Sequence, residues 1–238
     1  MTEVGPTGHL RVVSYNTHGC VGTDGRFAPR RIVEVLDELA PDVVGLQEVD
    51  TRRGKRHGVD VLELIARGTG MSLVFGPTLG SGEGRYGNAL VTRLPVRSVE
   101  HHDVSVFGRE RRGVIDARLE LRPGILRVII THLGLLRQER RKQVELIREL
   151  VDVDDDPEVT ILLGDMNEWQ PFSRQLRPLD GIFGACPRPR SFPSRWPMLR
   201  LDRVWVQPRG HLVEVRASRT PTARVASDHL PVLAIVSP

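Results

Sequence analysis

Apolar residues along the chain recur with two periods, one typical of strands and one typical of helices. Helical spacing occurs in three segments, residues 29–40, 59–70 and 135–151. Pro29 suits the first turn of the first segment, and Gly70 suits the end of the second. The other apolar runs are short and predict strands at residues 10–15, 42–47, 71–76, 87–96, 98–107, 113–121, 125–131, 160–165, 201–206, 212–217 and 230–236.

The order of these elements predicts an α/β (α+β) fold. Strands occur both in alternation with helices and as consecutive hairpins, so we expect two mixed, mainly antiparallel sheets packed face to face, with helices outside. A chain of 238 residues with 39% apolar content can bury one large core, and no linker is evident. We therefore expect one domain over residues 10–238 after a flexible N-terminus of residues 1–9. Residues 168–200, rich in proline and arginine, are expected to be irregular.

Polar groups collect where six of the predicted strands begin or end. Buried strands do not carry unpaired charge within their apolar runs, so charged groups gather at strand ends, where loops meet. These six positions supply only carboxylate, carboxamide and imidazole groups, which suggests that the fold brings them to one place. They are Asn16, Glu48, His132, the pair Asp165 and Asn167, Asp202, and the pair Asp228 and His229.

Three of these residues offer the oxygen ligands that a hard divalent cation prefers. Mg²⁺ is usually bound by one or two carboxylates together with water and substrate phosphate. Glu48 is the first candidate, and Asn16 and Asp228 offer further oxygens of the same type. A single glutamate at a strand end is more often a solvated loop residue. The metal site therefore depends on the three residues being close together.

The sequence GDMN places Asp165 and Asn167 two positions apart at the exit of a strand. The carboxylate can accept a proton from an attacking water, and the amide can donate to a phosphate oxygen. The alternative is an Asx-turn that closes the strand.

A histidine with a nearby carboxylate is the second catalytic candidate. Histidine is the side chain that ordinarily titrates near neutrality, and a second carboxylate such as Asp202 can orient His229 as an acid, a base or a phosphate contact. The alternatives are a surface turn for the Asp228–His229 pair and an ion pair with Arg203 for Asp202.

Other residues can contact the substrate. His132 can donate to a phosphoryl oxygen, or it can be a structural histidine. Tyr86 and Asn88 lie in a glycine-bearing turn at a strand entrance. Arg111 and Arg112 can clamp a phosphate or lie solvated in a hairpin.

Composition narrows the function classes further. The net charge is +4 and the pI about 9.6, and 32 of the 34 basic residues are arginine. A polyanionic partner such as nucleic acid explains this, and so does a GC-rich genome. The sequence contains no P-loop, GxGxxG, GxSxG, HExxH or CxxC motif, which disfavours nucleotide-driven, serine-hydrolase and thiolate-zinc chemistry. With two distant cysteines, no signal peptide and no transmembrane run, we expect a cytoplasmic protein, and we expect it to be a monomer.

Seven motifs in order resemble the endonuclease/exonuclease/phosphatase superfamily, over residues 10–236. They are YN at 15–16, LQE at 46–48, YGNALVTRLPV at 86–96, THL at 131–133, GDMN at 164–167, LDRVWV at 201–206 and SDHLPV at 227–232. The resemblance implies a four-layered α/β sandwich, a Mg²⁺ or Mn²⁺ cofactor and hydrolysis of a phosphoester by water.

The resemblance also implies a role for each residue. Glu48 would be the principal metal ligand, with Asn16 and Asp228 nearby. Asp165 would orient or deprotonate the water. Asn167 would hold the water or the phosphate, and His132 would stabilise the transition state. His229 would contact the phosphate, and Asp202 would hold His229.

The resemblance leaves two points open. Some relatives pair the first histidine with a glutamate near the tyrosine motif, where this chain has Asn88. Either Arg111 or Arg112 would contact the phosphate. The SFPS and LDR segments resemble small metal-dependent hydrolases of the superfamily, so we expect a small or lipid-derived phosphoester as substrate. A nuclease is the alternative, and a catalytically silent scaffold of the same fold is a third possibility.

Overall fold

The computed structural model describes residues 8–79, 85–122, 124–152, 158–170 and 173–238. The expected flexible segment 1–9 falls mainly on residues 1–7, which lie outside the described residues. The strands are β1 (Leu10–Asn16), β2 (Val43–Asp50), β3 (Ser72–Leu79), β4 (Tyr86–Thr92), β5 (Val96–Asp103), β6 (Gly113–Glu120), β7 (Ile125–His132), β8 (Val159–Asp165), β9 (Asp202–Gln207), β10 (Leu212–Ala217) and β11 (Val232–Val236). The α-helices are α1 (Arg30–Leu39), α2 (Thr51–Arg56), α3 (Val61–Thr69), α4 (Arg137–Asp152), α5 (Arg177–Phe183) and α6 (Pro221–Ala226), and two 3₁₀ turns cover His18–Cys20 and Arg209–His211.

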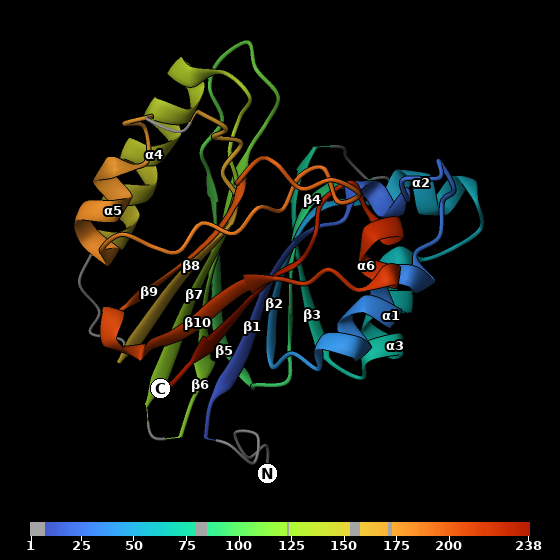
Figure 1. The fold of residues 1–238 in the computed structure, drawn as a ribbon, viewed down its shortest axis with the longest axis horizontal. Coiled ribbons are helices and arrows are strands. Elements are labelled where there is room, and N and C mark those ends of the chain that lie inside the picture. The colour runs from blue at the N-terminus through green and yellow to red at the C-terminus, as the bar shows by residue number, and fades with distance from the viewer. Residues whose placement is uncertain (1–7, 80–84, 123, 153–157, 171–172) are drawn as a thin grey trace.

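The described strands form two mixed sheets, as the sequence predicts. The six-stranded sheet has the order β10-β11-β1-β2-β4-β3, and the five-stranded sheet has the order β5-β6-β7-β8-β9. Neighbouring strands are antiparallel except for the pairs β1–β2 and β7–β8, which are parallel. Figure 1 shows α4 and α5 on one side of the paired sheets and α1, α3 and α6 on the other, which confirms the α/β sandwich.

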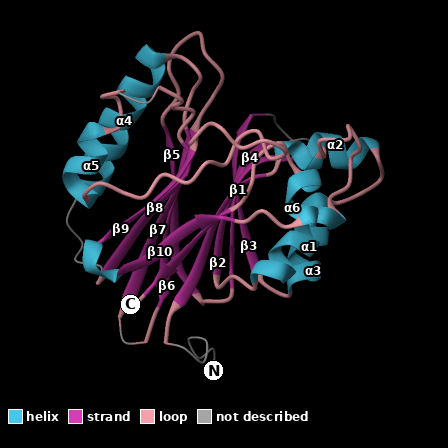
Figure 2. Cartoon of the chain, in the orientation of Figure 1, coloured by secondary structure: helices cyan, strands magenta, loops and turns pink. Residues whose placement is uncertain are grey.

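Three apolar clusters hold the layers together. The central cluster lies between the two sheets and takes residues such as Val12 and Leu163 from facing strands. The other two clusters bury the outer faces of the sheets against the helices shown in cyan in Figure 2. Gly45 marks a close approach of the sheets, because a Cβ there would lie 2.1 Å from the Leu163 Cδ1 atom. In the described part of the chain, the helices are too short or too polar to cross a lipid bilayer.

Two predicted strands end four residues earlier in the structure than expected. The strand expected over 87–96 ends at Thr92, and β5 begins at Val96. Pro95 in the connection has no N–H with which to continue a ladder. The strand expected over 98–107 ends at Asp103, whose carboxylate accepts a hydrogen bond from the Ser105 N–H at 2.8 Å and turns the chain.

The sequence patterns missed three short helices, α2, α5 and α6. Each is six or seven residues long, too short to show a helical period. Two have side-chain caps: Asp50 accepts from the N–H groups of Arg52 and Arg53 at the start of α2, and Thr220 caps α6 ahead of Pro221. The α5 helix corrects the expectation that residues 168–200 are irregular throughout.

Candidate active site

Strand pairing brings the predicted residues to one edge of the sandwich. In the five-stranded sheet, His132 is the register partner of Asp165, which is also the partner of Asp202. In the six-stranded sheet, Asn16 at the end of β1 lies opposite Gln47, next to Glu48. The ends of parallel strands and the starts of antiparallel strands meet at the same sheet edge, so polar groups distant in sequence become neighbours.

A bulge in β2 directs Glu48 into this cluster. The register between β2 and β4 shifts between Leu46 and Val49, and Glu48 has a φ of 58°, a left-handed conformation that is uncommon for a non-glycine residue. Its Oε1 atom accepts a hydrogen bond from Asn16 Nδ2 at 2.8 Å. Burial raises the pKa of Glu48, and the nearby Asp165 carboxylate adds to the rise while Asn16 opposes it.

Asn16 connects the two sheets. Its Nδ2 also donates to Asp165 Oδ2 at 3.0 Å, while its Oδ1 accepts from the His18 N–H at 3.0 Å. In this arrangement Asn16 presents its amide nitrogen, rather than its oxygen, to the two carboxylates. The expected metal-ligand role of Asn16 stays a prediction, and it requires the side chain to turn.

Asp165 lies at the centre of the cluster and is 1% exposed. Its Oδ1 accepts from the Asn167 N–H at 2.9 Å, the Asx-turn that the sequence left as an alternative. Its Oδ2 lies 3.6 Å from His132 Nε2 and 3.7 Å from His229 Nε2. The turn therefore fixes one oxygen of Asp165 and directs the other toward both histidines.

The backbone on either side of Asp165 is constrained. Gly164 has a φ of 150°, and a Cβ there would lie 1.9 Å from the Thr131 carbonyl oxygen, so only glycine fits. Asn167 has a φ of 49°. Its Nδ2 donates to the Leu133 carbonyl at 2.8 Å and lies 3.0 Å from His132 Nε2. These contacts hold both Asn167 and the His132 ring.

The two histidines have opposite electrostatic environments. Burial lowers the pKa of His132 to about 3, and the Asp165 charge only partly offsets this, so His132 is neutral near pH 7. Burial also disfavours charge on His229, but the Asp202, Asp165 and Asp228 carboxylates outweigh it and raise the pKa of His229 to about 10. His229 is therefore the cationic histidine of the pair.

Asp202 holds His229 as the sequence predicts. Its Oδ2 lies 3.0 Å from His229 Nδ1, which leaves Nε2 facing Asp165. The Asp202–Arg203 ion pair that the sequence left open does not form among the described residues; the Arg203 guanidinium donates to the Asp202 backbone carbonyl instead. Ser227, which the sequence analysis did not single out, donates to the Asn16 carbonyl at 2.7 Å and accepts from the His229 N–H.

The donor set fits a divalent cation. Ligand atoms of Asp165, Asp202 and His229 lie within 4.8 Å of one another, and the two carboxylates are the available ligands because a cationic His229 has no free lone pair. The buried Asp202 Oδ1 has no hydrogen-bond partner among the described residues. Glu48 and Asp228 add two further carboxylates, so four acidic groups surround one protonated imidazole. Oxygen ligands with an excess of negative charge suit a hard cation such as Mg²⁺.

The predicted substrate-contact residues differ in their placement. Arg112 is 5% exposed, forms an ion pair with Glu110 at 3.0 Å and is hydrogen-bonded to Tyr86. Arg111 is exposed at the surface. Tyr86 is the register partner of Asp50, two residues beyond Glu48, and burial together with the Glu48 charge raises its pKa. Arg112 is therefore the buried member of the pair, and a phosphate-contact role for either arginine stays a prediction.

Asn88 is placed differently from the other predicted residues. Its Nδ2 donates to the Gly113 carbonyl at 3.0 Å and links β4 to the start of β6. The described residues show no hydrogen bond between Asn88 and His132. A substrate-binding role for Asn88 stays a prediction.

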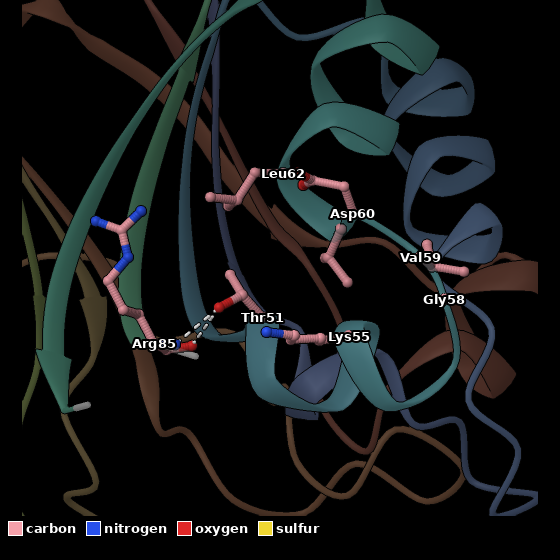
Figure 3. Close-up of a pocket in the computed structure, with 8 residues that line it drawn as sticks. Thr51, Lys55, Gly58, Val59, Asp60, Leu62 and Arg85 are labelled. Carbon is pink, nitrogen blue, oxygen red and sulfur yellow. Dashed lines mark hydrogen bonds between the residues drawn. The ribbon is translucent and has the colours of Figure 1, made fainter. Parts of the chain in front are cut away.

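A separate cavity of about 410 Å³ lies beside α2 and the start of α3 (Figure 3). The Arg85 N–H donates to Thr51 Oγ1 at 2.8 Å at one side of it, and Lys55 lies along the α2 side. No residue predicted for catalysis or metal binding lines this cavity. Its lining residues are Thr51, Lys55, Gly58, Val59, Asp60, Val61, Leu62 and Arg85.

The sequence profile of the "Endonuclease/Exonuclease/phosphatase family" matches residues 13–229, from β1 to the second histidine of the cluster. The chain belongs to this family. Members of the endonuclease/exonuclease/phosphatase family hydrolyse phosphoester bonds, so the family membership agrees with the cluster of acidic groups and histidines described above.

Relatives of this family match the chain over nearly its full length. The "Uncharacterized protein YbhP" of Escherichia coli K12 is 32% identical, with 94% of this chain and 95% of YbhP aligned. Among solved structures, the mannosyl-6-phosphatase Bt3783 of Bacteroides thetaiotaomicron has a TM-score of 0.73 at 17% identity, covering 95% and 99% of the two chains. The D. rerio TDP2 complexed with single-strand DNA product has a TM-score of 0.67 at 17% identity, covering 95% and 98%. At these identities the two structures establish the fold alone.

Proposed function

We propose that the chain is a phosphoester hydrolase that depends on a divalent metal, Mg²⁺ or Mn²⁺, and acts by in-line attack of water. The observation that carries the proposal is the position of Asp165, whose Oδ2 lies within 3.7 Å of both histidines and 3.0 Å from Asn16. Phosphoryl transfer requires positioning, neutralisation of developing charge and a base for water. The cluster offers residues for each of these tasks.

Glu48 would be the principal ligand of the cation, with Asn16 and Asp228 beside it. Asp228 is partly exposed, and its Oδ1 lies 3.4 Å from Ser227 Oγ, so the loop before β11 holds it near Asn16. A bound cation would neutralise negative charge that develops on the phosphoryl oxygens.

The remaining residues would act on the water and the phosphate. Asp165 would orient the attacking water and accept its proton. His229, cationic and held by Asp202 through Nδ1, would donate from Nε2 to a phosphoryl oxygen. Asn167 would hold the water or the phosphate. His132, being neutral, would contribute a hydrogen bond rather than a charge.

The substrate we propose is a small or lipid-derived phosphoester. The mannosyl-6-phosphatase of the same fold supports a small phosphomonoester as one choice. Nucleic acid is the alternative, and the D. rerio TDP2 complex supports testing it. A nuclease should lose binding steeply as salt rises, because its contacts to the phosphate backbone displace counterions. An activity that is insensitive to salt would argue against nucleic acid.

Hydrolysis of simple esters tests the proposal. The purified chain with Mg²⁺ or Mn²⁺ should hydrolyse bis-p-nitrophenyl phosphate or p-nitrophenyl phosphate, and EDTA should stop the reaction. Glu48→Ala and His229→Ala should each lower kcat by about 10²–10⁴. Glu34→Gln, an exposed acid on α1, is the matched control and should leave the rate unchanged. Full activity in the Glu48 or His229 variant would refute the site assignment, and inactivity of the unaltered chain on every ester would favour a silent scaffold.

A further inference from the structure

A second cavity of about 470 Å³ adjoins the catalytic cluster at the start of β9. Two of its lining residues are sequence neighbours of residues in the cluster: Glu168 follows Asn167, and Arg203 follows Asp202. We call it the arginine pocket. Its lining residues are Glu168, Trp169, Gln170, Arg188, Arg190, Met198, Leu199, Arg200 and Arg203.

The segment that carries Arg188 and Arg190 also reaches the catalytic cluster. Ser191 Oγ accepts from the Asp202 N–H at 3.4 Å, and the Phe192 ring lies 4.8 Å from the His229 ring, centroid to centroid. Short backbone connections therefore join the arginine pocket to the residues around the proposed phosphate site.

The arginine pocket is strongly cationic. The carboxylate of Glu168, the acid among its lining residues, is already paired with the buried Arg140 at 3.3 Å and accepts from Ser173 Oγ at 2.6 Å. Arg188 pairs with Asp180 at 3.3 Å. No such carboxylate partner is found in the described residues for the other three arginines of the lining, Arg190, Arg200 and Arg203.

Arg203 is the buried member of these arginines. It is 3% exposed, and its guanidinium donates to the backbone carbonyls of Arg200 and Asp202. Its buried Nε has no hydrogen-bond partner among the described residues. Leaving a guanidinium buried without a counter-anion is costly, so the arrangement suits a bound anion.

Two exposed apolar side chains complete the wall. Trp169 is 47% exposed and Met198 is 66% exposed, and the Arg140 guanidinium lies over the Trp169 ring at 5.2 Å. An anion-binding pocket with an exposed ring beside it suits the organic part of a phosphorylated molecule as well as its phosphate. Arginine in particular binds phosphate through two parallel hydrogen bonds.

We propose that the arginine pocket binds a second phosphate of the substrate, so that the preferred substrate is a phosphoester whose organic part carries another phosphate group. The proposal rests on the phosphoester hydrolysis proposed above. Arg190 and Arg200 contact the second phosphate from the rim, and Arg203 supplies positive charge from beneath. The scissile phosphate lies at the catalytic cluster.

A pair of chromogenic esters that differ by one phosphate tests this. The esters are the p-nitrophenyl ester of deoxythymidine 5′-phosphate, with and without a phosphate at the 3′ oxygen. With Mg²⁺, the bisphosphorylated ester should have a KM at least about tenfold lower, the usual effect of charge-assisted hydrogen bonds. Glycerophosphoinositol with and without a 4-phosphate is the second pair. A larger KM difference within the thymidine pair would indicate a nucleotide as the source of the second phosphate, and a larger difference within the inositol pair would indicate a lipid headgroup.

Arg190→Ala combined with Arg200→Ala should abolish the preference, because KM for the bisphosphorylated ester should rise to that of the ester with a single phosphate. Both side chains are exposed, so the variant should fold. Arg97→Ala, an exposed arginine at the opposite end of the five-stranded sheet, removes the same kind of charge and should keep the preference. Equal KM values within each pair, or a preference that survives in the double variant, would overturn the proposal.

Binding in EDTA separates this proposal from the proposed function. Deoxythymidine 3′,5′-bisphosphate should change the fluorescence of Trp169 and bind at least about tenfold more tightly than the 5′-monophosphate. Trp169→Phe identifies the responding tryptophan. One outcome is that neither ester is hydrolysed, while the unaltered chain shows this difference in binding and the double variant does not. The hydrolase proposal then fails and the subsite stands. If the esters are hydrolysed at equal KM and the nucleotides bind equally, the subsite fails alone.

Discussion

Replacing Asp202 with asparagine removes the charge that holds His229 while keeping the size of the side chain. Asp202 is fully buried, and its Oδ2 lies 3.0 Å from His229 Nδ1. An asparagine oxygen can still accept from Nδ1, so the ring keeps its position but loses its nearest negative charge. The variant therefore isolates the electrostatic part of the interaction.

The size of the effect follows from the pKa of His229. Burial alone would lower it, but Asp202 first and then Asp165 and Asp228 raise it from 6.5 to about 10. The net rise of 10 − 6.5 = 3.5 corresponds to about 5 kcal/mol, which is what remains of the carboxylates' effect after the opposing effect of burial. One adjacent opposite charge usually changes a pKa by about 1–3, so Asp202→Asn should lower the pKa of His229 by that amount.

Denaturation in urea, with EDTA present, measures the consequence for stability. A histidine whose pKa is higher in the folded state stabilises the fold fully below the unfolded value of 6.5, and this stabilisation is lost as pH rises through the folded value of about 10. Asp202→Asn should therefore lower the free energy of unfolding by about 1–4 kcal/mol at pH 6, and the difference should close towards pH 10. Asp24→Asn, an exposed carboxylate paired with Arg31, is the control and should not show this closing.

NMR of His229 and steady-state kinetics complete the test. The imidazole of His229 should titrate at lower pH in the variant, and kcat with metal should fall by about 10²–10³. An unchanged titration of His229, or a stability loss that is the same from pH 6 to pH 10, would refute the electrostatic role of Asp202.

Three further outcomes are expected. Mn²⁺ should raise the melting temperature of the unaltered chain but not of Glu48→Gln, because a ligand that binds only the folded state stabilises that state. An equal rise in both proteins would contradict the placement of Glu48 in the metal site. Burial raises the pKa of the Cys20 thiol to about 12 and of the Cys186 thiol to about 11, so the thiolate fraction at pH 8 is very small. Iodoacetamide should therefore label both thiols only after unfolding, and rapid labelling of the folded chain would contradict this. Arg127→Met should lower the free energy of unfolding by about 3–5 kcal/mol, because it leaves Asp116 buried without its partner at 2.6 Å, and adding Asp116→Leu should recover most of the loss in urea denaturation.

The residues at the strand ends could be predicted from the sequence, because strand ends are visible as a change from apolar to polar residues, whereas Asn88 and Arg111 lie elsewhere. His132, Asp165 and Asp202 are register partners on neighbouring strands, and this follows from strand order once the fold class is known. The contact between Asp202 and His229 was also predicted, since both residues open late strands. These predictions need only the period of the apolar residues and the residue types at strand ends, and both can be seen within a short stretch of sequence.

Conformations that depend on the whole fold were not visible in the sequence. The left-handed backbone of Glu48 arises from a bulge against β4, and no residue pattern at 46–49 marks it. The choice between Arg111 and Arg112 depends on which side chain the hairpin buries against Tyr86. The short helix α6 had a readable signal, Thr220 ahead of Pro221, but its six residues are too few for a helical period.

We expect metal binding and sheet packing to be interdependent at the catalytic cluster. Asn16 and Glu48 come from the six-stranded sheet, whereas Asp165 comes from the five-stranded sheet, and Asn16 bridges the two carboxylates. Packing the sheets through their shared apolar core brings like charges together, which opposes the packing. A divalent cation would remove that opposition. Its binding should therefore stabilise the contact between the sheets as well as prepare the site, and hydrogen exchange at the ends of β1 and β8 should slow on addition of Mn²⁺ more than exchange in β5.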